Sequence, residues 1–590
     1  MKLSKIYSTD PKFNSICFND NFNVIFGHVS NLDDLDKDSH NLGKSTLIDL
    51  IDFLLLKDIG KKHFLKKSQF SGHFFYLEIK LNSGKYVTIR RGVDKYSKIN
   101  MAIHLEGDQD YRKSADWTYE ELALGSSDEY KNPRIILNKL LNFDVLKGEI
   151  YRKTSGYFLR TQDDYKDVFK LQKYRGKDVQ WKPILFELLG FNSDSMINKY
   201  NIEMEIFDKE KLIEQVKSEF DVDSGEKDRI NGLINIAESE KDKIISWLDK
   251  FDFFQKEKNL SKEAVDKVEN KISSLNTVRY NLEYEISQIK QSLEAKTNYN
   301  FSDILEIYKE VEIYFPEKLT KSYEELIEFN NKLSTERLKY LSESLKHKIK
   351  KVEAVNKELE SLNLERTQML NVLKETDTFD KYNQYRNDLI EIERKIERYR
   401  MELESIDNVK KIQKEIYALK ECLTIETEKL SAQVDESTLI YKSIRNDFHE
   451  YVNFILEKNA MISIVINTNG NVEFDASFYN TLNEETAQGL GHTYRKLLCA
   501  CFDLAVIKNY MNKSFYRFIY HDGCLESLDP RKRVKYLQLV KNLSQKYNIQ
   551  YILTTLSSDI PESITILPED IAVELTDAED NSGRLFGFEF

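Results

Sequence analysis

The chain has 590 residues, of which 32% are charged, and a formal net charge of −12. This length leaves room for several domains, and the acidic balance excludes a global basic surface, so nucleic-acid contacts would need a local patch. The five cysteines form no C-x-x-C pair, which favours a reduced cytoplasmic setting over a disulfide framework. No apolar run approaches the length of a membrane span, and the N-terminus has no apolar signal region, so we expect a soluble, cytoplasmic protein.

A phosphate-binding loop is predicted near the N-terminus. Residues 22–26 form a short buried-strand pattern, and residues 46–56 form an apolar-rich helix pattern. Between them, NLGKST matches the second half of the pattern G-x-x-x-x-G-K-[ST]. The first glycine of that pattern would stand at Asp38, whereas the nearest upstream glycine is Gly27, so an acidic insert stretches the loop. This insert is either a cation site or a solvated loop.

Strand, loop and helix in this order suit a nucleotide, because backbone N–H groups at a helix start hold phosphates. Lys44 would reach the β- and γ-phosphates, and Ser45 would bind Mg²⁺. The expected nucleotide-binding residues of this segment are Gly27, Asn41, Gly43, Lys44, Ser45 and Thr46.

Long helices are expected in the middle of the chain. No proline lies between Pro183 and Pro316, or between Pro316 and Pro530. Apolar residues repeat every seven positions over residues 265–293, and again over residues 338–373, which indicates coiled coil. Pro316 could mark a turn at the far end, so that the two arms pair antiparallel. A helical bundle is the alternative.

Strand patterns flank this helical region. FFYLEIKLNSGKYVTIRRG predicts a β-hairpin that turns at Ser83-Gly84, and MISIVINTNGNVEFDASF predicts another at Asn469-Gly470. FYRFIYHD and IQYILTT are continuous apolar runs of the parallel-sheet kind. We therefore predict an α/β region that is split in sequence by a long helical excursion.

The C-terminal part should supply an aspartate for Mg²⁺ at a strand end, and Asp522 in FIYHD fits that role. A phosphate loop, a coiled-coil insertion and a C-terminal aspartate strand resemble the SMC-like ABC ATPases (structural maintenance of chromosomes). The resemblance implies an α/β, ABC-type P-loop ATPase head. Residues 1–200 and 446–590 would form its halves, and antiparallel coiled-coil arms would span residues 201–445 with a turn near residue 316.

The resemblance also implies how ATP is bound, since in that family two heads sandwich ATP and the signature motif of one head caps the other's γ-phosphate. QGLGH at residues 488–492 stands at the signature position, which assigns Gly489 and Gly491 to the nucleotide. GYFLRTQDDY resembles the Q-loop, which makes Gln162 a ligand of Mg²⁺ or water. Asp529 has the spacing of the D-loop aspartate.

The departures from the family pattern concern hydrolysis. Gly523 stands where the family has its catalytic glutamate, and Leu556 stands where a switch histidine is expected. Loss of the general base costs ~10²–10⁴-fold in rate. Glu526 or His521 could substitute as the catalytic residue, although neither has the family's spacing. We expect slow hydrolysis, with ATP acting mainly as a clamp between two heads.

A narrower resemblance fits these departures. MKLSKIYS, the loop ending NLGKST, HDG, and the arm FNNKLSTERLKYLSESL resemble the SMC-like subunits of bacterial Lamassu-type and related ABC-three-component anti-phage systems. This implies a small middle subunit and an effector, often a nuclease, which is released when foreign or broken DNA is sensed. A chromosome-maintenance or DNA-repair ATPase of the same architecture is the alternative.

Other candidate sites are weaker. The basic stretches GKKHFLKK and KHKIKK could contact DNA phosphates or could be ordinary solvated faces. Cys499 and Cys501 fit helix packing better than metal binding, and no histidine pair has ligand spacing. We expect no metal other than nucleotide-bound Mg²⁺.

Overall fold

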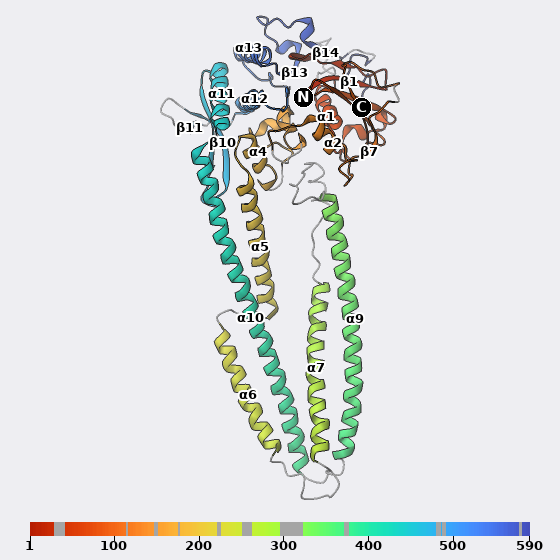
Figure 1. The fold of residues 1–590 in the computed structure, drawn as a ribbon, viewed down its shortest axis with the longest axis vertical. Coiled ribbons are helices and arrows are strands. Elements are labelled where there is room, and N and C mark those ends of the chain that lie inside the picture. Colours follow the sequence, from red (N-terminus) through yellow and green to blue (C-terminus); the bar gives the residue numbers. More distant parts are fainter. Residues whose placement is uncertain are drawn as a thin grey trace. The chain divides into compact units, whose positions relative to one another are not determined.

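The computed structural model describes residues 1–28, 42–113, 116–146, 151–174, 178–220, 226–249, 262–294, 323–370, 377–479, 485–486, 491–577 and 581–590. The chain divides into two compact units. The first consists of Met1–Tyr200, Asn300–Leu326 and Ile425–Phe590, and the second of Asn201–Tyr299 and Ile327–Thr424. The first is mixed α/β and the second is made of long helices (Figure 1).

A five-stranded parallel sheet lies in the first unit, in the order β14-β3-β13-β12-β8. Its strands are β3 (Phe22–His28), β8 (Leu159–Arg160), β12 (Phe518–Asp522), β13 (Gln550–Leu556) and β14 (Ile571–Thr576). The two ends of the chain are interleaved, because β3 pairs with β14 on one side and β13 on the other. The predicted α/β region, split in sequence, is therefore confirmed.

A second sheet of six antiparallel strands has the order β2-β1-β4-β5-β6-β7. Its strands are β1 (Lys2–Ser8), β2 (Ile16–Cys17), β4 (Phe74–Lys80), β5 (Tyr86–Gly92), β6 (Lys98–His104) and β7 (Tyr119–Ala123). The predicted hairpin β4–β5 is confirmed, with Gly84 at a φ of 85° in its turn. Helix α1 (Lys44–Leu54) contacts β12 of the parallel sheet and β4 and β5 of this one, so it packs against both sheets.

The second predicted hairpin belongs to a smaller sheet in the order β11-β10-β9. Its strands are β9 (Asn459–Ile466), β10 (Val472–Tyr479) and β11 (Glu485–Thr486), with Gly470 at a φ of 72° in the hairpin turn. Helix α11 (Leu439–Leu456) packs on β9 and also contacts α12 (His492–Asn509) and α13 (Pro530–Tyr547). Helix α12 in turn contacts β12 and the short turn η4 (Gln162–Lys166), so it lies beside the parallel sheet.

Short elements complete the first unit. Its other α-helices among the described residues are α2 (Pro133–Leu141), α3 (Ser155–Phe158) and α4 (Lys182–Leu188). Its other 3₁₀ turns are η1 (Phe64–Lys66), η2 (Ser68–Phe70), η3 (Tyr151–Lys153), η5 (Asp178–Gln180), η11 (Ser557–Asp559) and η12 (Pro568–Asp570).

The long helices are α5 (Asp194–Phe220), α6 (Lys227–Asp249), α7 (Lys262–Glu294), α9 (Tyr323–Leu370) and α10 (Asp377–Glu436). The two predicted heptad runs lie on α7 and α9, which pack together through Val268, Ile272, Leu359 and Leu362. Lys271 of α7 forms an ion pair with Glu358 of α9. Glu285, which comes later in α7, pairs with Lys348, which comes earlier in α9. The two helices therefore pair antiparallel. Pro316 lies outside the described residues, and a turn near it stays a prediction.

Helix α10 adds pairings that the heptads did not indicate. It packs against α5 through Val409 and Ile416, and against α6 through Ile406. It also contacts α7, where Arg386 forms a buried ion pair with Glu269. The described helices thus form antiparallel pairs and also a local contact of three helices. They share features of both alternatives, the coiled coil and the helical bundle.

The C-terminal boundary of the helical region differs from the expected residue 445, because the first unit begins again at Ile425. The last turns of α10 already belong to the α/β core, where Leu430 is fully buried. Ser437 then adopts a φ of 53°, and the Thr438 hydroxyl caps the new helix α11 by accepting from the Tyr441 N–H. Among the described helices, none is both long and apolar enough to cross a membrane.

Candidate functional site

The predicted loop ends in a tight turn at the start of α1. Gly43 has a φ of 97°, a left-handed conformation that favours glycine, and Lys44 is the first residue of the helix. The Lys44 side chain extends back over the end of β3, because a Cβ added at Gly27 would lie 2.9 Å from Lys44 Nζ. Gly27, the nearest upstream glycine in sequence, is therefore also the residue that makes room for Lys44.

The C-terminal segment braces this turn. The Leu585 N–H donates to the Leu42 carbonyl at 3.1 Å, and a Cβ on Gly43 would lie 2.7 Å from the Leu585 side chain. Thr46 Oγ1 donates to the Gly43 carbonyl at 2.9 Å. Sequence patterns did not indicate the Leu585 contact, since it joins residues from opposite ends of the chain.

Asp522 brings the C-terminal half to the same place. It ends β12, is 3% exposed, and accepts a hydrogen bond from Thr554 Oγ1 at 2.5 Å. Burial raises the pKa of Asp522, although hydrogen bonds from Thr554 and Ser45 oppose that shift. The Ser45 hydroxyl and the Asp522 carboxylate, both predicted ligands of Mg²⁺, are thus in contact.

Lys44 lies in the field of the same acidic groups. Burial lowers the pKa of Lys44, and the carboxylates of Asp522, Glu526 and Asp559 act in the opposite direction. Hydroxyl and carboxylate oxygens beside a lysine ammonium are a donor set that suits a magnesium-bound phosphate. The residues present therefore fit a nucleotide with Mg²⁺.

Glu526 lies close to Gly523. A Cβ added at Gly523 would lie 2.8 Å from Glu526 Oε1 and 2.7 Å from Gln162 Nε2, and Gly523 has a φ of 60°. Gln162 Nε2 donates to Glu526 Oε1 at 3.3 Å. The Glu526 carboxylate thus occupies the space that a side chain at position 523 would enter, and the predicted Q-loop residue contacts it.

His521 is placed differently from the expectation that it could serve as a base. Successive residues of a strand point to opposite faces, so His521 points away from the side chain of Asp522. It is fully buried, with Nε2 3.1 Å from Asp503 Oδ2 and Nδ1 2.7 Å from the Tyr551 hydroxyl. Burial lowers its pKa, against the opposing effect of Asp503. Since both nitrogens are engaged in the interior, this geometry gives His521 a structural role.

The partner of His521 is a buried ion pair between Asp503 and Arg160. Arg160 Nε and Nη2 donate to the two Asp503 oxygens at 2.7 and 2.8 Å, and both side chains are fully buried. Arg160 also donates to the carbonyls of Asp164, Asp167 and Val168, so it ties η4 and the residues after it to α12.

We expect Asp503→Asn to destabilise the first unit by about 3–5 kcal/mol, because it leaves a buried guanidinium without its carboxylate. Chemical unfolding of the full chain, followed by tryptophan fluorescence, measures the change. Asp110→Asn removes the partly exposed ion pair with Arg112 and should cost less than about 1 kcal/mol. Equal stability of Asp503→Asn and the parent chain would contradict a structural role for this ion pair.

Two of the remaining predicted site residues, Asp529 and Gly491, belong to the described residues, and two do not. Asp529 caps α13 by accepting from the Arg531 N–H at 3.0 Å, and contacts with Arg531 lower the pKa of Asp529. Gly491 is exposed and immediately precedes α12. Asn41, Gly489 and the acidic insert lie outside the described residues, so their roles stay predictions.

A histidine missed by the sequence reasoning lies near the expected switch position. Leu556 pairs with Gly27 in the sheet, and the next residues of both strands meet, with His28 Nδ1 3.0 Å from Ser557 Oγ. A search along the chain after Leu556 cannot find His28, because it comes from the neighbouring strand β3.

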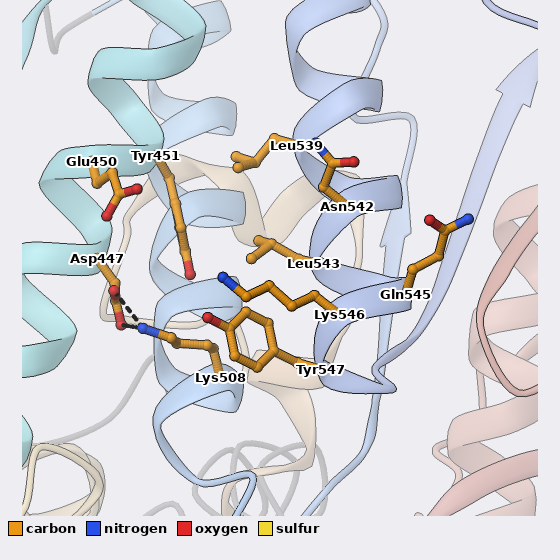
Figure 2. A pocket seen from close by; sticks show the side chains of 10 residues that line it. All are labelled: Asp447, Glu450, Tyr451, Lys508, Leu539, Asn542, Leu543, Gln545, Lys546 and Tyr547. Carbon is orange, nitrogen blue, oxygen red and sulfur yellow. Dashed lines mark hydrogen bonds and ion pairs between the residues drawn. The ribbon is translucent and has the colours of Figure 1, made fainter.

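A separate hollow of about 590 Å³ lies between α11, α12 and α13. Figure 2 shows Lys508 donating to both oxygens of Asp447 in its wall, at 2.7 and 2.8 Å. The lining side chains are Asp447, Glu450, Tyr451, Lys508, Leu539, Asn542, Leu543, Gln545, Lys546 and Tyr547. None of these residues belongs to the cluster around Lys44 and Asp522.

Comparisons with known proteins show what the chain is similar to, but the family and the protein matched by sequence are both described as uncharacterised. Residues 450–590 match a family model described as "Uncharacterised protein conserved in bacteria (DUF2326)". The chain is 21% identical over 612 residues to the uncharacterized protein YydD of Bacillus subtilis (strain 168), and the alignment covers 98% of this chain and 96% of that protein.

One solved structure to which the chain is similar is that of the Smc head domain with a coiled coil and joint derived from Pyrococcus yayanosii. The identity is 14% and the TM-score 0.34, with 95% of this chain and 93% of that chain covered. A TM-score this low does not by itself establish a shared fold, so the fold assignment rests on strand order and contacts.

Proposed function

We propose that this chain is an SMC-like ATP-binding protein that holds ATP and Mg²⁺ between the two interleaved ends of its sequence. The observation that supports this most strongly is the contact between the Ser45 hydroxyl and the Asp522 carboxylate, beside Lys44. Parallel sheets bind ligands at the carboxyl ends of their strands, and both β3 and β12 end at this site.

In this proposal each side chain has a distinct role. Ser45, Asp522 and Gln162 supply oxygen ligands to Mg²⁺ or its water, and Lys44 offsets the charge of the β- and γ-phosphates. Gly43 and Thr46 form the turn whose N–H groups would hold the phosphates. The nucleotide supplies the phosphoryl group that is transferred to water.

Glu526 is the proposed general base, because its carboxylate fills the space that a side chain at position 523 would enter. Gln162 orients that carboxylate through their hydrogen bond. The base reaches the site from a turn instead of directly from the strand end, so we propose slow hydrolysis and a long-lived ATP-bound state.

We further propose that two copies pair through their heads around ATP. Gly489, Gly491 and Asp529 would contact the nucleotide held by the other copy. The exposed position of Gly491 at the start of α12 supports this, because a partner can approach the helix start there.

Gly491→Arg is expected to prevent ATP-dependent pairing, because it places a bulky charge at that surface while the loop at Lys44 is unchanged. Mass in solution with ATP and Mg²⁺ should rise to that of a dimer for the parent, and pairing by the variant should be at least ~10-fold weaker. Gly232→Arg is the matched control, since nothing lies within 4 Å of a Cβ there. Equal pairing by Gly491→Arg and the parent would remove residues 488–492 from the proposed interface.

The finer proposal is that the paired protein senses or clamps DNA in the cytoplasm. It would control an effector, a nuclease by class, through a small middle subunit in bacterial anti-phage or anti-plasmid defence. Exposed lysines in GKKHFLKK support a DNA-binding patch, namely Lys61, Lys62, Lys66 and Lys67.

Plaque counts distinguish this proposal from chromosome maintenance or DNA repair. Cells carrying the gene with its neighbours should resist phage, and loss of ATP binding should abolish that resistance. A repair or chromosome-maintenance ATPase would instead give sensitivity to DNA damage or segregation defects, with plaque counts unchanged.

A further inference from the structure

Lys496 is a buried lysine beside Glu526, and it is not among the residues that the proposed function assigns to ATP or Mg²⁺. It lies in the second turn of α12, with a side chain that is 4% exposed. Its Nζ donates to the Gly523 carbonyl at 3.1 Å and lies 3.4 Å from Glu526 Oε2. One cation thus contacts both the backbone at position 523 and the carboxylate at position 526.

The Glu526 carboxylate is held from two sides. Oε1 accepts from Gln162 Nε2 at 3.3 Å, and Oε2 faces Lys496 at 3.4 Å. Both distances are at the long end for hydrogen bonds, so each contact is weak and easily adjusted. The Glu526 side chain is 38% exposed, and without Lys496 it could turn into solvent.

Helix α12 connects this contact to the protein surface. The helix begins just after the exposed Gly491, and Lys496 projects from it toward Glu526. Because a helix moves as a rigid element over so short a distance, a displacement of its first turn also displaces Lys496.

We propose that Lys496 is a positioning residue that holds the Glu526 carboxylate at the side-chain space of Gly523 and couples it to the surface at Gly491. This inference rests on the proposed ATPase function. Contact of a second copy with the start of α12 would then set the position of the base within the same chain.

If Lys496 had only a structural role, its substitution would have different effects on stability and kcat. A buried ammonium needs oxygen partners in either case, so the contacts alone do not separate the two roles. Loss of a structural lysine lowers stability, and its effect on hydrolysis does not depend on whether Glu526 is present. Loss of a positioning residue lowers kcat through Glu526 alone.

The test compares Lys496→Met, Lys496→Arg and Lys508→Met in the full chain, with ATP and Mg²⁺. We expect Lys496→Met to lower kcat by ~10–100-fold and to change KM and ATP affinity by less than ~2-fold. Lys496→Arg should recover most of kcat, because its guanidinium can contact the same oxygens. Lys508→Met removes a lysine ion pair from the same helix and should leave kcat unchanged.

Two further readouts separate positioning from folding. Lys496→Met combined with Glu526→Gln should be no slower than Glu526→Gln alone, since both act through one carboxylate. Parent turnover per site should rise with protein concentration as heads pair, and Lys496→Met should lose that rise. Lys496→Gln, which keeps an N–H donor for Gly523, replaces Lys496→Met if the latter unfolds more than a few degrees below the parent.

The outcomes are distinguishable from failure of the proposed function. A parent chain that neither binds nor hydrolyses ATP refutes the proposed function, and this inference with it. An active parent with unchanged kcat in Lys496→Met, or additive losses in the double variant, refutes the role of Lys496 only.

Discussion

Lys44→Ala should abolish measurable ATP binding, with a loss of affinity of at least ~100-fold, or about 2.7 kcal/mol. The Lys44 ammonium lies over Gly27, and the carboxylates of Asp522 and Glu526 act on its pKa. Without it, the phosphates would enter a site that keeps the carboxylates of Asp522 and Glu526 but lacks the ammonium expected to contact the β- and γ-phosphates. Equilibrium titration with a fluorescent ATP analogue in the presence of Mg²⁺ measures the loss.

The matched control is Lys62→Ala, which removes an exposed lysine close in sequence and should leave ATP affinity unchanged. Asp522→Asn tests the proposed Mg²⁺ ligand from the C-terminal half of the chain. This variant should lose much of its ATP affinity only when Mg²⁺ is present. Unchanged ATP affinity in Lys44→Ala would show that NLGKST is not a phosphate loop in this protein.

Seven of the described strands could be predicted because burial or a hairpin turn leaves a local signature in their sequence, namely β3, β4, β5, β9, β10, β12 and β13. The strands β12 and β13 are buried on both faces and consist of continuous apolar runs. The hairpin turns were visible as Ser83-Gly84 and Asn469-Gly470. Such signals depend only on residues that are neighbours along the chain.

The pairing of the long helices could not be predicted in the same way. A heptad repeat specifies an apolar seam but not the helix that covers it. Helix α10 divides its apolar residues between contacts with α5 and α6 and meets α7 through the Arg386–Glu269 ion pair, so its sequence shows no single regular seam.

The candidate site also has features that could be predicted from the sequence and features that could not. The meeting of Ser45 with Asp522 could be expected, because parallel strands bring their carboxyl ends to one edge of a sheet. The return of Glu526 to Gly523 depends on a turn that begins at Gly523, whose φ is 60° and whose carbonyl accepts from the Glu526 N–H at 3.3 Å. The burial of His521 depends on Asp503 and Arg160, which are distant in sequence. Spacing in the sequence contains neither fact.

Glu526→Gln is expected to lower ATP turnover by ~10²–10³-fold while leaving ATP affinity within ~2-fold of the parent. Glutamine keeps the size of the side chain and can still contact Gln162, but it cannot accept a proton from the attacking water. Steady-state hydrolysis and equilibrium binding, measured on the same preparation, separate the two effects. Glu562→Gln, an exposed carboxylate on the same part of the chain, is the control and should leave turnover unchanged.

Gly523→Glu completes this test, because it places the usual base of the resembled family at its usual position. If the site at 523 were open, this substitution would raise hydrolysis. The structure predicts the opposite, since a Cβ there would lie 2.7 Å from Gln162 Nε2 and 2.8 Å from Glu526 Oε1, on a backbone with a φ of 60°. We therefore expect Gly523→Glu to displace Glu526 and to lower turnover. Turnover that is fast in the parent and unaffected by Glu526→Gln would mean that the base lies elsewhere in the chain.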